Sequence, residues 1–147
     1  ALGVARASLD VAIELMGAKT PRGDQNTLRN SSAIQREVGK AEATWASARA
    51  FLVEATESAW EYACDNRSLT QELRIRLRLA STHAILKATE VVDVAYQMCG
   101  ATSVFGISPI QRRFQDIHVV AQHLQGRLAH YETVGQYYLG LEPSGWF

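Results

Sequence analysis

The sequence predicts an all-α fold, an up-down four-helix bundle in which two long helices run antiparallel. Apolar residues recur at alternating steps of four and three through most of the chain, which is the period of helices that pack in bundles. Three prolines and ten glycines among 147 residues are too few for a disordered chain. We therefore expect residues 1–147 to form a single helical-bundle domain.

The first predicted helix runs from about Leu2 to Met16, where apolar residues recur at every third or fourth position, and Gly17 ends it. The chain begins inside this helix, with neither an initiator methionine nor an N-cap, as a fragment of a longer protein would. The polar segment 18–30 follows and is the longest irregular stretch that we expect. Loops of this length in compact domains often carry function.

Two long helices come next along the chain. We expect the second helix to begin at an S-x-x-Q capping box at residues 32–35 and to fade near residues 65–66. A similar box at residues 68–71 opens the third helix, and Gly100 is its expected C-cap. Each helix has about 30 residues, or ~45 Å at 1.5 Å per residue. The short connection between them predicts an antiparallel hairpin.

The last predicted helix begins at a third capping box. Ser108 is its expected cap, Pro109 occupies the first helical position, and the Gln111 side chain reaches back. The helix runs towards Leu141, and an interruption is allowed for near Asp116.

The composition argues against several broad classes of protein. Fifteen basic and fifteen acidic side chains balance, so we expect no general attraction for nucleic acid or an anionic membrane surface. The sequence has no run of about 18 apolar residues and no signal peptide, which favours a cytoplasmic protein. Cys64 and Cys99 lack metal-site spacing, and we expect two reduced, buried thiols near helix ends.

Self-association is a further expectation. Long hairpin helices need facing helices along their length, and the first helix is too short to supply them. An alanine-rich seam on the second helix also permits close helix approach; it comprises Ala41, Ala48, Ala55 and Ala59. We predict a homo-oligomer, either a dimer or a tetramer.

Few residues in this chain have the pattern of a catalytic or metal site. His118 and His123 are five positions apart and no Glu-x-x-His motif occurs, so no metal is expected. Cys99 lies at a helix C-terminus, where the dipole disfavours a thiolate nucleophile. His83 is interpreted as a packing or helix-surface residue. A local ion-pair cluster is expected from Arg112, Arg113, Asp116 and His118.

Two loops between helices could together hold an anionic cofactor. The segment AKTPRG, residues 18–23, supplies Lys19, Thr20 and Arg22. The segment QMCGATS, residues 97–103, supplies backbone N–H groups and hydroxyls near a helix end. The alternative is a solvated loop and an ordinary glycine cap. His123 follows Gln122 on the last predicted helix and, taken alone, is usually structural.

The long hairpin, then YQMCGATSVF, then SPIQRRFQDIHVVAQH, resemble in that order the C-terminal helical domain of the acyl-CoA dehydrogenase fold. The closer resemblance is to the two-component, reduced-flavin-dependent (group D) monooxygenases, and it extends from residue 1 to about residue 143. Members of this fold are homotetramers with an N-terminal helical domain and a middle β-domain. The resemblance implies that this chain is roughly the last third of a longer flavoenzyme.

The same resemblance implies contacts to the flavin of a neighbouring subunit, either FMN or FAD. The dehydrogenase loop RKTFG corresponds to residues 18–22, where Thr20 is retained, Ala18 replaces the arginine and Arg22 stands nearby as a substitute. The loop QxFGGxG corresponds to residues 97–103, with Ala101 in place of the second glycine. The implied cofactor-binding residues are Thr20, Arg22, Gln97, Gly100, Ala101, Thr102 and Ser103.

The catalytic residue implied by the resemblance is His123. In the monooxygenases a histidine at this position faces the flavin and is thought to help form or hold the flavin hydroperoxide; imidazole can exchange protons near neutrality. Many dehydrogenases carry a catalytic glutamate that falls at Leu124 when aligned on Asp116, and leucine cannot be a base. Gln115 departs from the arginine common before that aspartate, which removes a usual salt bridge.

Three functions remain open at this point. The first is a monooxygenase that receives reduced flavin from a separate reductase and oxygenates an aromatic or other small organic substrate. The second is an acyl-CoA dehydrogenase whose base lies outside this chain. The third is an oligomerisation bundle without activity, which binds no flavin alone because the β-domain is missing.

Overall fold

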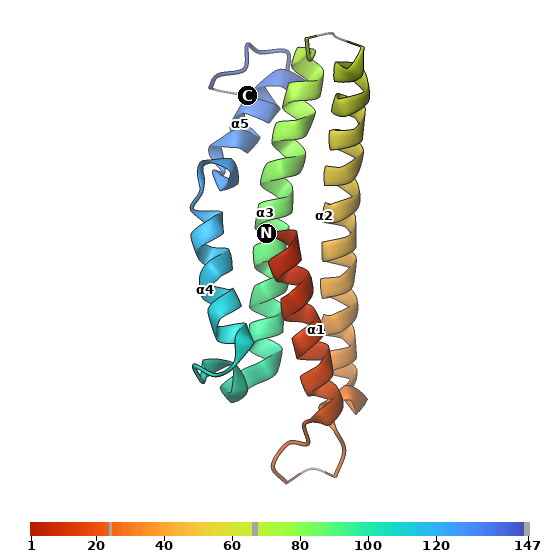
Figure 1. Cartoon of the computed structure of the whole chain (residues 1–147), viewed down its shortest axis with the longest axis vertical. Coiled ribbons are helices and arrows are strands. Elements are labelled where there is room, and N and C mark those ends of the chain that lie inside the picture. Colours follow the sequence, from red (N-terminus) through yellow and green to blue (C-terminus); the bar gives the residue numbers. More distant parts are fainter. Residues whose placement is uncertain (24, 66–67, 146–147) are drawn as a thin grey trace.

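The computed structural model describes residues 1–23, 25–65 and 68–145, and these residues form helices and loops with no strand among them. This confirms the all-α fold class. Figure 1 shows the elements in order. They are α1 (Leu2–Ala18), η1 (Leu28–Asn30), α2 (Ser32–Cys64), α3 (Gln71–Cys99), η2 (Gly100–Val104), α4 (Pro109–Ala121), η3 (Leu124–Gly126) and α5 (Ala129–Tyr138), where η marks a 3-10 helix.

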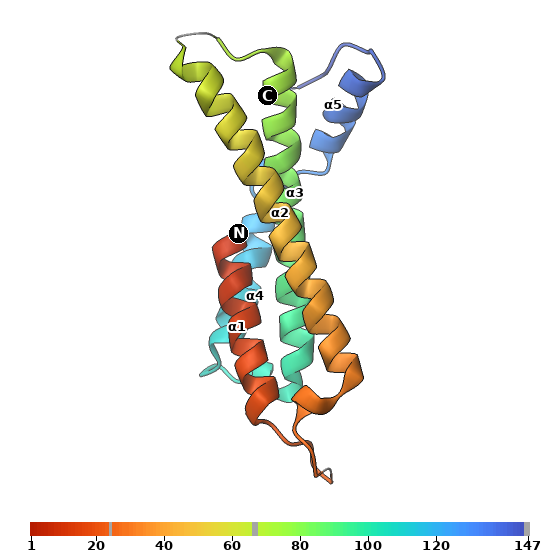
Figure 2. The same ribbon diagram turned by 90° about the vertical axis from the view of Figure 1, so that its right-hand side faces the viewer.

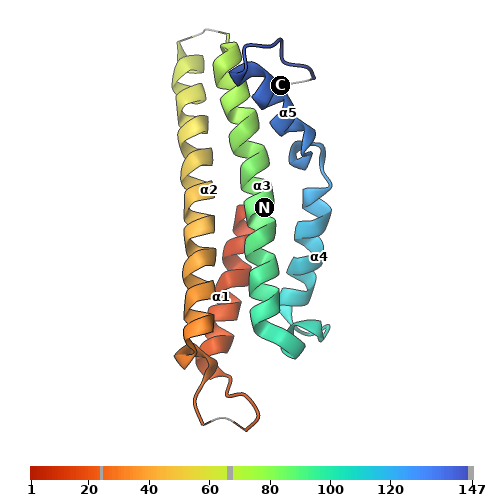
Figure 3. The same cartoon turned by 180° about the vertical axis from the view of Figure 1, so that it is seen from behind.

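The long helices α2 and α3 run antiparallel along the whole molecule (Figure 1). Helix α1 packs against the lower half of this pair, and α4 and α5 follow one another along the other side of α3 (Figure 3). The expected four-helix bundle therefore forms with α4 and α5 in the place of one last helix. Figure 2 shows that α2 and α3 cross and that α5 leans away from α3.

The break in the last helix lies further along the chain than expected. Helix α4 continues past Asp116 to Ala121, and α5 begins only at Ala129. The segment between them contains η3, a short turn that the sequence pattern did not indicate. Helix α1 also runs one residue beyond Gly17, which therefore does not end it.

None of the three predicted capping boxes forms, although the third correctly places the N-cap at Ser108. Ser31, not Ser32, is the N-cap of α2, and the Gln35 amide donates to the Arg29 carbonyl at 3.0 Å. Thr70, not Ser68, caps α3 through a 3.2 Å bond from the Leu73 N–H.

In the third box, Ser108 is the N-cap of α4 and Pro109 occupies the first helical turn, but the serine side chain makes no cap bond. The Gln111 side chain instead accepts a hydrogen bond from the Tyr96 hydroxyl at 3.1 Å. Both Gln35 and Gln111 were expected to reach back to a cap, and both found partners outside their own helices.

The alanine seam of α2 is buried within the chain itself, so it permits close packing of the chain's own helices and is not a face left free for a partner. Its members are Ala41, Ala48, Ala55 and Ala59. A core cluster joins Ala41 of this seam to α1, α3 and α4 through Leu9, Val92 and Ile117. Cys99 is buried as expected, but Cys64 is exposed at the end of α2, which corrects the expectation of two buried thiols.

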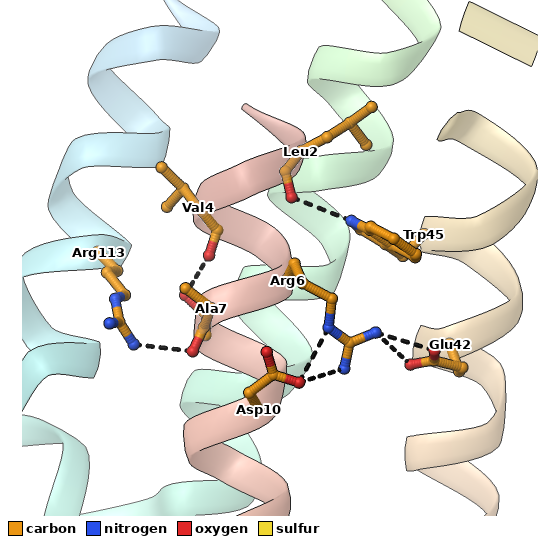
Figure 4. Close-up of polar contacts among 9 residues, drawn as sticks. Leu2, Val4, Arg6, Ala7, Asp10, Glu42, Trp45 and Arg113 are labelled. Carbon is orange, nitrogen blue, oxygen red and sulfur yellow. Dashed lines mark hydrogen bonds and ion pairs between the residues drawn. The ribbon is translucent and has the colours of Figure 1, made fainter. Parts of the chain in front are cut away.

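Three polar contacts hold the N-terminal half of α1 against its neighbours (Figure 4). The Trp45 indole N–H donates to the Leu2 carbonyl at 3.0 Å. Arg6 bridges Asp10 and Glu42, with its closest contact to Glu42 at 2.6 Å. On the opposite side, Arg113 donates to the Ala7 carbonyl at 2.8 Å.

Within the described residues, no helix combines the length and the apolar character that a membrane-spanning segment requires.

Candidate functional site

The two loops that the sequence analysis paired lie together at one end of the bundle. Lys19 caps the C-terminus of α1, and its ammonium group donates to the Thr102 hydroxyl at 3.0 Å and to the Cys99 carbonyl at 3.2 Å. The carbonyl belongs to the last residue of α3, where helix carbonyls lack intrahelical partners. The lysine therefore ties the segment after α1 to the segment after α3.

The loop after α3 is shaped by Gly100 and Ser103. Gly100 has a φ of 57°, a conformation that favours glycine, and it is the C-cap that the sequence predicted. The buried Ser103 hydroxyl donates to the Gly100 carbonyl at 2.6 Å and thereby closes the turn. Ser103 is thus occupied within the loop, while Gln97 and Ala101 are exposed.

The loop after α1 presents Thr20 and Arg22 to the surface. Its ends are drawn together by a bond of 2.9 Å from the Leu28 N–H to the Lys19 carbonyl. This geometry leaves Thr20 and Arg22 outward while Lys19 turns inward to Thr102. Lys19 was part of the sequence-level loop hypothesis but not of the predicted cofactor-binding set.

An apolar surface adjoins this pair of loops. Val104, Phe105 and Ile107 follow Ser103 and are exposed by 62%, 63% and 97%. Three large apolar side chains are thus exposed within four residues of one loop. Exposed apolar side chains that gather in this way are typical of surfaces that contact another protein segment or a ligand.

His123 does not lie on a helix, contrary to the sequence-based prediction. Helix α4 ends at Ala121, and His123 is the N-cap of η3, with its Nδ1 accepting a hydrogen bond from the Gln125 N–H at 3.3 Å. The side chain is exposed. Leu124 beside it is 54% exposed. The turn therefore presents one imidazole and one apolar side chain to the surroundings.

The η3 turn is attached firmly to α3. The Thr82 hydroxyl donates to the Gln125 carbonyl at 2.9 Å, and Arg78 donates through Nη1 to the Gln125 side-chain oxygen. A Cβ on Gly126 would lie 2.6 Å from the Ala121 carbonyl oxygen, so the turn needs glycine there. Sequence reasoning missed Gln125; the available signal was a glycine inside an otherwise helical pattern.

A cleft of about 450 Å³ opens next to this turn. Leu124, Arg127 and His130 line it together with Thr133 and the C-terminal segment at Ser144. The His130 Nε2–H donates to the Leu124 carbonyl at 2.7 Å, and the Thr133 hydroxyl donates to the Ser144 carbonyl at 2.7 Å. The cleft wall is thus built from η3, α5 and the C-terminal segment.

The structure does not bring His123 to the loop residues. Helix α4 separates them, and its 13 residues span roughly 20 Å at 1.5 Å per residue. The predicted site residues therefore form two groups at opposite ends of α4. One is the loop pair around Lys19 and Thr102, and the other is the η3 turn with His123.

The ion-pair cluster predicted near Asp116 is only partly formed. Arg112 lies 3.8 Å from Asp116 in an exposed pair, while Arg113 bonds the Ala7 carbonyl. His118 contacts Asp93 of α3 through Nε2 at 3.0 Å and not Asp116. His118 takes this partner because the packing of α4 on α3 brings Asp93 opposite it.

Burial shifts the pKa values of Cys99 and His83. Burial raises the pKa of the Cys99 thiol, partly opposed by the nearby charge of Lys19, which disfavours a thiolate there. Burial lowers the pKa of His83, and Lys87 adds to the shift. His83 packs edge-on to Phe51 with ring centroids 6.1 Å apart, so it is a packing residue.

The described residues contain no group of three or more His, Cys, Asp or Glu side chains that could hold a metal ion.

Comparison with known proteins shows the family and the fold to which this chain belongs. The family described as acyl-CoA dehydrogenase, C-terminal domain, matches residues 1–127. The chain belongs to this family. Its fold is also that of a solved structure, XiaF from Streptomyces sp. in complex with FADH2 and glycerol, with a TM-score of 0.90 at 21% identity. The match covers 99% of this chain and 37% of XiaF.

Two curated relatives of this acyl-CoA dehydrogenase C-terminal domain are named for different activities, one as a monooxygenase and the other as a putative dehydrogenase. An indole-3-acetate monooxygenase from Pseudomonas putida is 34% identical over 142 residues, which are 97% of this chain and 36% of that protein. A putative acyl-CoA dehydrogenase from Bacillus subtilis (strain 168) is 30% identical over 117 residues, which are 79% of this chain and 29% of that protein. The chain therefore spans about a third of the length of the curated relatives it matches.

Proposed function

We propose that this chain is the C-terminal domain of a two-component flavin-dependent monooxygenase. The whole protein would receive reduced flavin, FMN or FAD, from a separate reductase and use O₂ to oxygenate an aromatic or other small organic substrate. The relatives support this reading, because an indole-3-acetate monooxygenase is 34% identical over 97% of this chain. Its name also favours a substrate with an aromatic ring.

The observation that carries the proposal is the η3 turn. His123 is exposed there, and its Nδ1 is occupied by the Gln125 N–H, so the Nε2 edge faces away from the turn's own hydrogen bond. A neutral imidazole with Nδ1 as acceptor carries its proton on Nε2, which makes Nε2–H a donor. Such a donor can form a hydrogen bond that stabilises negative charge developing on a reduced flavin and its oxygen.

The neighbouring Leu124 argues for a monooxygenase over a dehydrogenase. Leu124 is exposed on the same turn, where a dehydrogenase of the common type would carry its glutamate base. An apolar side chain at that position cannot remove a proton from a substrate carbon. At these two positions the turn therefore has a hydrogen-bond donor and no carboxylate.

The loop pair at the other end of α4 is proposed to contact the flavin of a neighbouring subunit. Thr20, Arg22, Gln97, Gly100 and Ala101 are accessible there, and Lys19 fixes Thr102 between them. A single chain cannot place both groups on one flavin ring, because α4 separates them. Two cofactors in a homo-oligomer, a dimer or a tetramer, satisfy both groups.

The second candidate is an acyl-CoA dehydrogenase with its base outside this chain. The 30% identity to a putative acyl-CoA dehydrogenase favours it. Oxidation of an acyl-CoA with electron transfer to a dye, without product oxygenation, would support this candidate and contradict the first.

The test replaces His123 with alanine and with glutamine in the whole protein that carries this chain. We expect the amount of oxygenated product per reduced flavin oxidised to fall about 100-fold in His123→Ala, the range for loss of one hydrogen-bond donor to developing negative charge. Hydrogen peroxide should account for the remaining flavin oxidation. His123→Gln, which keeps an N–H donor on its side chain, should retain more of the product yield than the alanine variant does. An unchanged product yield in both variants would remove His123 from the proposal.

A further inference from the structure

We propose that Thr82 positions His123: through Gln125 it fixes the imidazole in the tautomer that presents Nε2–H, and so it controls the yield of the oxygenation. This inference rests on the proposed function for its consequence, but the positioning itself can be measured without flavin. Three hydrogen bonds carry it, one step along the chain of contacts at a time.

The first step is between His123 and Gln125. A neutral imidazole has one donor and one acceptor nitrogen, and the Gln125 N–H at 3.3 Å makes Nδ1 the acceptor. The proton must then lie on Nε2. The same bond sets the ring orientation, since the imidazole caps its own turn as the N-cap of η3. A shift of the Gln125 backbone would release both the tautomer and the orientation.

The second step is between Gln125 and α3. The Thr82 hydroxyl donates to the Gln125 carbonyl at 2.9 Å, and Arg78 holds the Gln125 side chain. Gln125 is therefore held at its N–H, its carbonyl and its side chain. This matters because η3 is a single short turn whose own backbone bonds are few. They run from the Gly126 N–H to the His123 carbonyl at 2.8 Å and from the Arg127 N–H to the Leu124 carbonyl at 3.4 Å.

The third step is that the Thr82 contact is specific to this turn. Threonine hydroxyls on helices commonly bond the carbonyl four residues earlier on the same helix, as Thr89 does with Ile85 at 3.0 Å. The hydroxyl of Thr82 reaches another element instead. Thr82 is 0% exposed, and a buried hydroxyl needs a partner. Removing it would leave the Gln125 carbonyl without its partner on α3.

The substitutions that test this are matched on one helix. Thr82→Val keeps the shape of the side chain and removes the hydroxyl, and Thr82→Ala removes both the hydroxyl and the methyl group. Thr82→Ser keeps the hydroxyl and should therefore behave as the wild type does. Thr89→Val is the control, because it removes a threonine hydroxyl two turns further along α3 whose bond stays within that helix.

The primary measurement is the ¹⁵N spectrum of His123 by solid-state NMR of histidine-labelled whole protein, with the signal assigned by its loss in His123→Gln. We expect wild type, Thr82→Ser and Thr89→Val to show the tautomer with the proton on Nε2. Thr82→Val and Thr82→Ala should show a mixture of both tautomers. A wild-type spectrum in both hydroxyl-deleted variants would overturn the inference, as would a mixed tautomer in the wild type.

The product yield per flavin oxidised gives the second measurement. Loss of an orienting partner of a histidine costs about tenfold, so Thr82→Val should lose about that factor and Thr82→Ser should recover it. A yield in Thr82→Ser as low as in Thr82→Val would contradict the positioning role. If the tautomer shifts as expected while His123→Ala retains full yield, the proposed function fails and the positioning of His123 stands.

Discussion

Lys19 and Thr102 lie 83 positions apart in the sequence and share a hydrogen bond of 3.0 Å. Through this contact one end of the bundle becomes a single surface composed of the loop after α1 and the loop after α3. The same ammonium group also bonds the Cys99 carbonyl, the last of α3. A single side chain therefore joins two helix ends and both loops.

Replacement of Lys19 by methionine should lower the free energy of unfolding by about 1–3 kcal/mol, because a half-buried carbonyl and hydroxyl lose a charged donor. Urea denaturation followed by circular dichroism measures this. Lys40→Met is the matched control: Lys40 forms an exposed ion pair with Glu37 at 3.1 Å, and such pairs contribute little. Equal losses in the two variants would show that the Lys19 contacts add nothing beyond a surface charge.

The helical elements were predictable because their apolar periods are long and regular. The seam from Ala41 to Ala59 lies in α2 as predicted, and Gly100 ends α3 where its position in the pattern indicated. Burial of a stripe is a property that the sequence carries locally. Loop 18–23 and loop 97–103 could be paired only as a hypothesis, since nothing local shows that the ends of α1 and α3 meet.

The third capping box and the local ion pair of His118 failed for one physical reason. Polar side chains such as Gln111 and His118 have several partners of similar strength, and tertiary packing decides among them. In the structure Gln111 and His118 therefore bond Tyr96 and Asp93 of α3, and not the predicted local partners. The η3 turn was missed because its anchor, Thr82, lies 43 positions away from Gln125.

His83 should lower the free energy of unfolding when the pH falls into the mildly acidic range. Burial and Lys87 lower its pKa in the folded state below the ordinary value of about 6.5. A depressed folded pKa contributes stability that is present above the unfolded pKa and is lost as pH falls through the folded pKa. We therefore expect the urea midpoint of the wild type to fall between pH 7 and pH 5, and the fall to be smaller in His83→Gln. The same pH dependence in both proteins would assign the effect to other groups.

The attachment of α1 to α2 should depend on the indole N–H of Trp45. Trp45→Phe keeps an aromatic ring but loses the bond to the Leu2 carbonyl and weakens the contact with the Arg6 guanidinium, which lies 5.1 Å from the ring centroid. A loss of about 1–2 kcal/mol in unfolding free energy is expected. Trp60, which is 71% exposed, provides the control. Trp60→Phe should stay within about 0.5 kcal/mol of wild type, as surface substitutions do.

The turn that carries His123 should not tolerate any side chain at position 126. In Gly126→Ala the new Cβ would lie 2.6 Å from the Ala121 carbonyl oxygen and 3.3 Å from the Ile85 Cγ2 atom. The first of these is backbone and cannot rotate away, so α4 and η3 must move apart, at a cost of about 1–3 kcal/mol in unfolding free energy. Gly135→Ala, inside α5, meets nothing within 4 Å and should instead stabilise the protein by up to about 1 kcal/mol, because alanine favours a helix over glycine. Thermal and urea unfolding of the two variants measure both changes. Losses of the same size would mean that backbone freedom, and not the close approach of Ala121, sets the need for glycine at position 126.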